Sequence, residues 1–250
     1  DKPVPQQYLT YMNNLLHVDL GYSIKKTGKT VVYIIKEAFP VSAKLGLISL
    51  LFAEAVGLFF GILCAQFRGK WPDYLLMVVA VLGIALPSMV LGPILRMIFG
   101  VKLSILPVTG WGKPNQIILP ALVLGLGTVA GNTRNMRASM LAITTQDYVK
   151  TARAKGLSPI RVVLKHQFKN SLVPIIPNLG VQIAGVLMGS FVVESMFLIP
   201  GLGRYFVDSV TNLDYPLIMG LTVFYGAFLV TMNLIVDVLY GLIDPRIRVK

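Results

Sequence analysis

The sequence predicts an all-α, polytopic bundle of transmembrane helices, and three observations support that class. Hydrophobic residues make up 55% of the 250 residues and charged residues only 14%, whereas a soluble domain carries about 25% charged residues. The mean hydropathy is +0.71. Several apolar runs reach the roughly 20 residues that a helix needs to cross a bilayer. A soluble protein of this length would have too little polar surface to cover them, so we predict five spans in this chain.

The elements follow in order along the chain. Residues 1–40 are mixed and polar, and they lack the charged segment and apolar core of a signal peptide. The apolar runs predict spans at about Val41–Phe67, Tyr74–Phe99, Ile117–Leu141, Leu172–Phe197 and Leu217–Ile243. Glycine pairs at a spacing of four residues favour close packing of helices. They are Gly57 with Gly61, Gly127 with Gly131, and Gly185 with Gly189.

The distribution of Lys and Arg predicts the orientation, because the cytoplasmic loops of membrane proteins are enriched in both. Most of the basic residues between spans lie in 144–171, which we call the cytoplasmic loop. The opposite loops, 100–116 and 198–216, carry only Lys102, Lys113 and Arg204. We therefore expect the cytoplasmic loop and the tail 244–250 inside the cell, and residues 1–40 outside. An external segment without a signal peptide also predicts a further transmembrane helix before Asp1, unless residues 1–40 cross as a short tail.

The cytoplasmic loop has local signals for two short helices joined by a glycine corner. Thr144 is expected to cap the first helix, with Asp147 completing a capping box. Gly156 is placed to end that helix in the left-handed conformation. Ser158 then caps a second helix, and Pro159 fits its first turn, where a missing N–H costs nothing.

Polar residues inside the predicted spans are candidates for a translocation path or gate, because exposing them to lipid would be costly. They are Glu54, Asn178, Gln182, Glu194, Asn233 and Asp237. Hydrogen bonding between helices would explain any one of them equally well.

The residues that enzymes and metal sites need are nearly absent. The chain has one cysteine and two histidines, and it contains no HExxH or GxSxG sequence. The triplet Gly28-Lys29-Thr30 is not a phosphate loop, because Ser23 stands where that motif needs a glycine. We therefore expect no catalytic residue, bound metal or cofactor in this chain, and no ATP hydrolysis by it.

The cytoplasmic loop resembles the EAA loop of ABC importer permeases. In the general signature, Lys150-Thr151-Ala152 occupy the Glu-Ala-Ala positions, and only Ala152 and Gly156 match. The stretch Tyr148–Leu157 is much closer to the YVRTARAKGL form of dipeptide and oligopeptide permeases. Further matching motifs, in the same order as in that subfamily, are Asp19–Ser23, Leu106–Gly110, Glu194–Gly203, Asp214–Pro216 and Asp244–Arg246. The resemblance covers the whole chain and is closest to the B-type permease subunit of oligopeptide importers.

This resemblance implies a type I importer fold, with residues 41–243 as the transmembrane domain, in the cytoplasmic (inner) membrane of a prokaryote. The first helix of the cytoplasmic loop, 146–157, would couple transport to separate ATPase subunits by docking on them. Its implied coupling residues are Tyr148, Lys150, Thr151, Ala152, Arg153, Ala154, Lys155, Gly156 and Leu157. The implied partners are a second homologous permease subunit, two ATPase subunits that hold ATP and Mg, an extracytoplasmic peptide-binding protein and membrane lipids.

Several alternatives stay open at this stage. The cations of the 146–157 helix would also suit anionic lipid headgroups. DNA binding is disfavoured, because both ends of the helix pair are tied to spans, so we expect no nucleic-acid partner. Related importers carry dipeptides, nickel chelates or glutathione. A secondary transporter that uses Glu54 and Asp237 as coupling groups is a further alternative, although such proteins often have inverted repeats and none is evident here.

Overall fold

The structure, a computed structural model, describes residues 3–187 and 189–243, so the predicted tail 244–250 lies outside the described residues. Within these ranges the regular secondary structure is helical, apart from one isolated β-bridge, Tyr22 with Thr30. The helices are α1 (Val4–Leu16), α2 (Val31–Gln66), α3 (Trp71–Ala85), α4 (Ser88–Leu95), η1 (Arg96–Lys102), α5 (Pro114–Thr144), α6 (Asp147–Ala154), α7 (Pro159–Arg161), η2 (Val162–Phe168), α8 (Lys169–Leu172), α9 (Ile176–Leu187), α10 (Phe191–Phe197), α11 (Leu202–Thr211) and α12 (Tyr215–Ile243). The all-α class is confirmed.

By length and composition, 3 of the described helices can each cross a membrane. If each bent helix pair is also counted as one span, the described residues contain up to 5 spans. The three are α2, α5 and α12, which agrees with the first, third and fifth predicted spans. Helix α2 begins ten residues before the predicted Val41. Its start is set by Thr30, whose hydroxyl accepts a hydrogen bond from the Tyr33 N–H at 3.1 Å. Pro40 lies within the helix, so α2 continues through the predicted start of the span, and the boundary between the external segment and the transmembrane domain stays a prediction.

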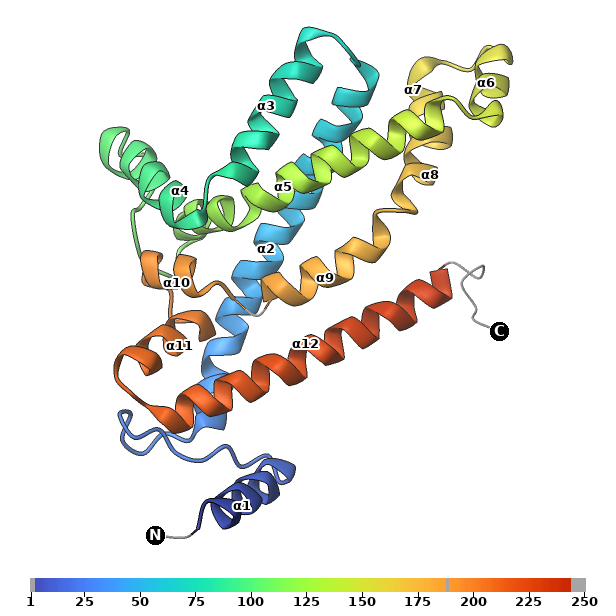
Figure 1. The fold of residues 1–250 in the computed structure, drawn as a ribbon. Coiled ribbons are helices and arrows are strands. Elements are labelled where there is room, and N and C mark those ends of the chain that lie inside the picture. The colour runs from blue at the N-terminus through green and yellow to red at the C-terminus, as the bar shows by residue number, and fades with distance from the viewer. Residues whose placement is uncertain (1–2, 188, 244–250) are drawn as a thin grey trace.

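The second and fourth predicted spans are not single helices. Helix α3 ends at Ala85, and the following pair α4–η1 departs from it at 111°, as Figure 1 shows. Leu86 has an extended backbone, ψ 112°, because the ring of the following Pro87 disfavours the helical conformation there. In the fourth span, α9 and α10 meet at 41°. The prediction of one continuous helix was wrong in both places.

Helices α2 and α5 cross at the centre of the molecule (Figure 1). A Cβ atom built on Gly57 would lie 2.7 Å from the Cβ of Asn132, and one on Gly61 would lie 2.5 Å from the Cβ of Met136. Only glycine permits this approach. The first predicted glycine pair therefore packs two helices, whereas Gly131 and Gly185 face open space.

A buried ion pair fixes the start of α3 against α5. The guanidinium of Arg137 donates two hydrogen bonds to the carboxylate of Asp73, each 2.7 Å long. The Gly69 N–H donates a third at 3.0 Å. Asp73 is only 2% exposed, so its charge is balanced within the protein. The ion pair therefore joins α5 to the turn between α2 and α3.

Candidate functional site

The helix predicted to couple transport to ATPases is present as α6, and it ends at a glycine corner. Gly156 has φ +73°, which confirms the predicted left-handed conformation. The Gly156 N–H donates to the Arg153 carbonyl at 2.9 Å, and the Leu157 N–H donates to the Ala152 carbonyl at 3.4 Å. These two bonds form a Schellman motif, in which the last carbonyls of a helix are satisfied by the turn that follows it.

The other end of α6 differs from the prediction. Thr144 is the last residue of α5, and its hydroxyl donates to the Met140 carbonyl at 2.8 Å. Gln146 is the residue that precedes α6, and its side chain makes no capping hydrogen bond. The predicted capping box from Thr144 to Asp147 was therefore wrong.

One face of α6 is buried against the second helix of the loop. Val149, Ala152 and Val162 form a small buried cluster, and Leu157 packs against it half-buried. The remaining predicted coupling residues are exposed: Tyr148, Lys150, Thr151, Arg153, Ala154, Lys155 and Gly156. Ala152 thus lies inside, where it sets the distance between α6 and η2. An outside partner would meet the exposed face, which is basic with one aromatic ring.

The second helix of the cytoplasmic loop is continuous from α7 through η2 to α8 and carries a buried amide, Gln167. Its Nε2 donates to the Thr144 hydroxyl at the end of α5, at 3.0 Å. Its Oε1 accepts from the Gln66 amide at the end of α2, at 3.2 Å. Gln167 is 0% exposed. This one side chain therefore links the support of α6 to the ends of the two central helices.

Two of the predicted path residues are brought together by a third that was not predicted. Asn132 on α5 donates to the Glu54 carboxylate on α2 at 2.7 Å. Its oxygen accepts from the Gln182 amide on α9 at 3.0 Å. Asn132 is 0% exposed, and it lies opposite Gly57, where α2 and α5 pack closely. The role of Glu54 and Gln182 in a translocation path stays a prediction.

The positions of the other predicted path residues differ. Glu194 is buried at the opposite end of the bundle from α6, where its carboxylate accepts hydrogen bonds from backbone N–H groups. Asn178 is exposed on α9, and Asn233 is half-buried on α12. Asp237 lies on α12, and its side chain is outside the described residues. The structure thus joins Glu54 with Gln182 through Asn132 and places Glu194 at the other end of the bundle.

Sequence reasoning missed Asn132 and Gln167. Asn132 is a polar residue within an apolar run, which is the same signal that singled out Gln182, so it could have been predicted from the sequence. Gln167 gave no such signal, because it lies among the charged residues of the cytoplasmic loop. Its burial depends on partners 23 and 101 residues away.

Solved structures with this arrangement of helices are ABC importers. A structure described as the MetNI methionine ABC transporter in an inward-facing conformation superposes with a TM-score of 0.71, covering 85% of this chain and 97% of that chain at 14% identity. An amino acid ABC transporter gives a TM-score of 0.62, covering 83% of this chain and 92% of that one at 18% identity. At such identities the likeness shows the fold alone, which is that of an ABC importer permease.

The chain belongs to the family described as binding-protein-dependent transport system inner membrane component, which matches residues 57–249. The dipeptide transport system permease protein DppB of Bacillus subtilis is 43% identical over 248 residues, 99% of this chain and 80% of the relative. The oligopeptide transport system permease protein OppB of Haemophilus influenzae is 41% identical over 250 residues, covering 99% of this chain and 82% of the relative. This is therefore an inner-membrane permease subunit of an ABC importer and not an enzyme.

Proposed function

We propose that this chain forms part of the path of an ATP-driven peptide importer and that α6 receives the movement of separate ATPase subunits. The proposal rests on how α6 is packed against the rest of the chain. An exposed short helix is closed by a left-handed corner at Gly156 and rests on η2, and the buried Gln167 ties η2 to the ends of α2 and α5. A push on α6 would therefore reach both central helices through the two hydrogen bonds of the buried Gln167 side chain.

The competing role for α6, holding anionic lipid headgroups, explains less of this arrangement. Lipid binding needs only exposed cations near the membrane surface. It needs neither the buried amide of Gln167 nor the close seating of Ala152. The exposed face also carries Tyr148, Thr151 and Ala154, which suit close contact with a protein groove better than contact with phosphates.

Peptides are the cargo that the relatives favour. The relatives named for dipeptides and for oligopeptides are similar to this chain to nearly the same degree, 43% and 41% identical. We therefore infer a peptide importer, without a preference for length. Its other components would be a second homologous permease subunit, two ATPase subunits with ATP and Mg, and an extracytoplasmic peptide-binding protein. Loop charges favour α6 inside the cell, which places the loop before α2 and the helix α11 outside.

The test is peptide uptake in cells that contain the whole importer, with ATP depleted while the proton gradient is maintained. We expect uptake of labelled peptides to stop with the loss of ATP. Continued uptake would refute an ATP-driven mechanism and favour the secondary transporter. Competition by unlabelled dipeptides, longer peptides, glutathione and nickel chelates would then identify the cargo, and competition by the last two alone would refute the peptide assignment.

Replacing Gln167 with Leu should weaken coupling more than it weakens the fold. The substitution keeps the size of the side chain but removes both hydrogen bonds that link η2 to α5 and α2. Each of the two hydrogen bonds contributes about 0.5–1.5 kcal/mol net, and about 1.4 kcal/mol corresponds to a factor of ten. We expect peptides transported per ATP hydrolysed to fall about tenfold, measured as uptake and ATPase activity in the same proteoliposomes.

The matched control for this experiment is Asn170→Leu. Asn170 lies one turn further along, is exposed, and donates to the His166 carbonyl within its own helix. We expect this variant to keep the wild-type ratio. A Gln167→Leu importer with an unchanged ratio would show that the link does not transmit movement.

A further inference from the structure

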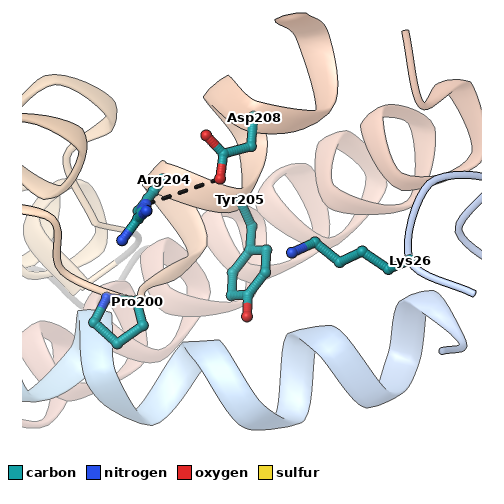
Figure 2. A pocket seen from close by; sticks show the side chains of 5 residues that line it. All are labelled: Lys26, Pro200, Arg204, Tyr205 and Asp208. Carbon is teal, nitrogen blue, oxygen red and sulfur yellow. Dashed lines mark ion pairs between the residues drawn. The ribbon is translucent and has the colours of Figure 1, made fainter. Parts of the chain in front are cut away.

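At the end of the bundle opposite to α6, a pocket of about 180 Å³ lies between the loop before α2 and the helix α11. Its lining comes from both segments: Lys26, Pro200, Arg204, Tyr205 and Asp208. Figure 2 shows the amine of Lys26 directed at the ring of Tyr205, with Arg204 and Asp208 on the far side of that ring. Four of the five lining residues have a polar or charged end group, so the pocket suits a polar ligand.

The loop that carries Lys26 is held in place by a buried carboxylate, Asp214. This carboxylate, 1% exposed, accepts hydrogen bonds from the Ser23 hydroxyl and from the Ile24 N–H, the latter at 3.1 Å. The Ser23 oxygen in turn accepts from the Lys26 N–H at 2.8 Å. Burial alone would raise the pKa of Asp214, but the donated hydrogen bonds outweigh it and hold that pKa below its ordinary value. The carboxylate is therefore ionised at neutral pH and fixes the backbone of Lys26.

The turn that carries Arg204 is held by a second buried carboxylate, Glu194, which is 0% exposed. It accepts hydrogen bonds from the Gly203 N–H at 2.8 Å and from the Arg204 N–H at 3.3 Å. Beside it, the Ser42 hydroxyl on α2 accepts from the Leu202 N–H at 2.8 Å. On each side of the pocket, hydrogen bonds to a buried carboxylate therefore fix the backbone of the segment that carries the cation. Asp214 does this for the Lys26 loop, and Glu194 does it for the Arg204 turn.

The charges of the pocket are incompletely balanced. The Lys26 amine lies 4.3 Å from the centroid of the Tyr205 ring and has no ion pair within the described ranges. The Arg204 Nε lies 3.8 Å from the Asp208 Oδ2, too far for a hydrogen bond. Among the lining residues, two cations therefore face one loosely placed carboxylate, and the lining itself has a net charge of one positive unit. A ligand with a single negative charge would balance it.

We propose that this pocket receives an Asp or Glu side chain of the extracytoplasmic binding protein when that protein docks on the permease. The inference rests on the proposed function and deepens it by naming the contact. A carboxylate accepts charge-assisted hydrogen bonds from a guanidinium. Arg204 donates from Nη1 to the Leu198 carbonyl at 3.2 Å and lies too far from Asp208 for a hydrogen bond, so donors remain for an incoming carboxylate. A phospholipid headgroup fits less well, because the described lining offers Pro200 but no apolar groove for acyl chains.

Electrostatic contacts of this kind set the rate and register of docking. Charge reversal at Lys26 or Arg204 should therefore weaken docking without changing the transport step that follows it. The expected effect is about a tenfold rise in the concentration of binding protein that gives half-maximal ATPase stimulation, at an unchanged maximal rate.

The experiment uses the whole importer in nanodiscs with its purified, peptide-loaded binding protein, and it titrates ATPase stimulation for the wild type, Lys26→Glu, Arg204→Glu and Lys25→Glu. Lys25 is the matched control, because it is an exposed neighbour on the same loop and its reversal makes the same change in net charge. We expect the shift for the two pocket variants and less than a twofold shift for the control. Reversal of one acidic residue on the binding protein to Lys should restore the affinity of Lys26→Glu.

Three results would overturn the proposal. They are an unchanged half-maximal concentration in both pocket variants, an equal shift in Lys25→Glu, and a shift that appears only in nanodiscs with anionic lipid, which would assign the pocket to headgroups. Failure of the proposed function would look different, because wild-type ATPase activity would then not respond to the binding protein at all.

Discussion

Replacing Asp73 with Leu is expected to lower the free energy of unfolding by about 3 kcal/mol. Removing one partner of a buried ion pair leaves an uncompensated charge, which costs about 3–5 kcal/mol. The lower end of that range applies here, because the Arg137 side chain is 28% exposed and retains some hydration. The Gly69 N–H also loses its acceptor. Denaturant titration in detergent micelles, followed by tryptophan fluorescence, measures the change.

The double variant Asp73→Leu with Arg137→Leu separates charge imbalance from loss of packing. Apolar residues of similar volume often replace a buried ion pair without loss of stability, so we expect the double variant to recover most of the deficit. A second control is Asp147→Leu, since the Asp147–Lys150 pair is exposed at both ends and pairs of that kind contribute about 0–1 kcal/mol. An Asp73 variant as stable as the Asp147 variant would contradict the role assigned to the buried pair.

The features that the sequence predicted correctly are those with local causes. The corner at Gly156 is one, because only a residue tolerant of positive φ closes a Schellman motif. The three unbroken spans are others, since the length and apolar content of a run decide them.

The breaks within spans show where local signals fail. Pro87 marks the sharp bend after α3, yet Pro40 and Pro120 lie inside the unbroken helices α2 and α5. A proline in a membrane helix is tolerated when neighbouring groups satisfy the carbonyl that it frees. Whether they do so depends on packing, and a single sequence does not show that packing.

The end of α5 and the polar network have nonlocal causes. Thr144 has the residue type of a helix cap, but it continues α5 and accepts a hydrogen bond from Gln167. Likewise, Glu54 and Gln182 were singled out separately, and only the folded chain shows that Asn132 joins them. Part of the candidate site could therefore be recognised by residue type, while its connections could not.

Replacing Gly156 with Val is expected to abolish most coupled transport while leaving the membrane bundle intact. A Cβ atom at this position would meet no other atom within 4 Å, so the effect comes from the backbone and not from a clash. A β-branched residue at positive φ is a conformational outlier, and holding it there costs about 1–3 kcal/mol. That strain favours opening of the Schellman turn, which would release Val149 and Ala152 from the cluster that seats α6 on η2.

Peptide uptake and binding-protein-stimulated ATPase activity in the same proteoliposomes test this prediction. We expect uptake to fall at least tenfold and to lose its link to ATP hydrolysis, with wild-type insertion and unfolding midpoint. Gly156→Asn is the matched control, because asparagine tolerates the left-handed conformation, and it should keep much of the uptake.

The variant Ala152→Leu tests the same contact between α6 and η2, since a larger side chain at this buried position pushes α6 away from η2. Wild-type coupling in both Gly156→Val and Ala152→Leu would show that the seating of α6 does not carry the movement of the ATPases to the membrane helices.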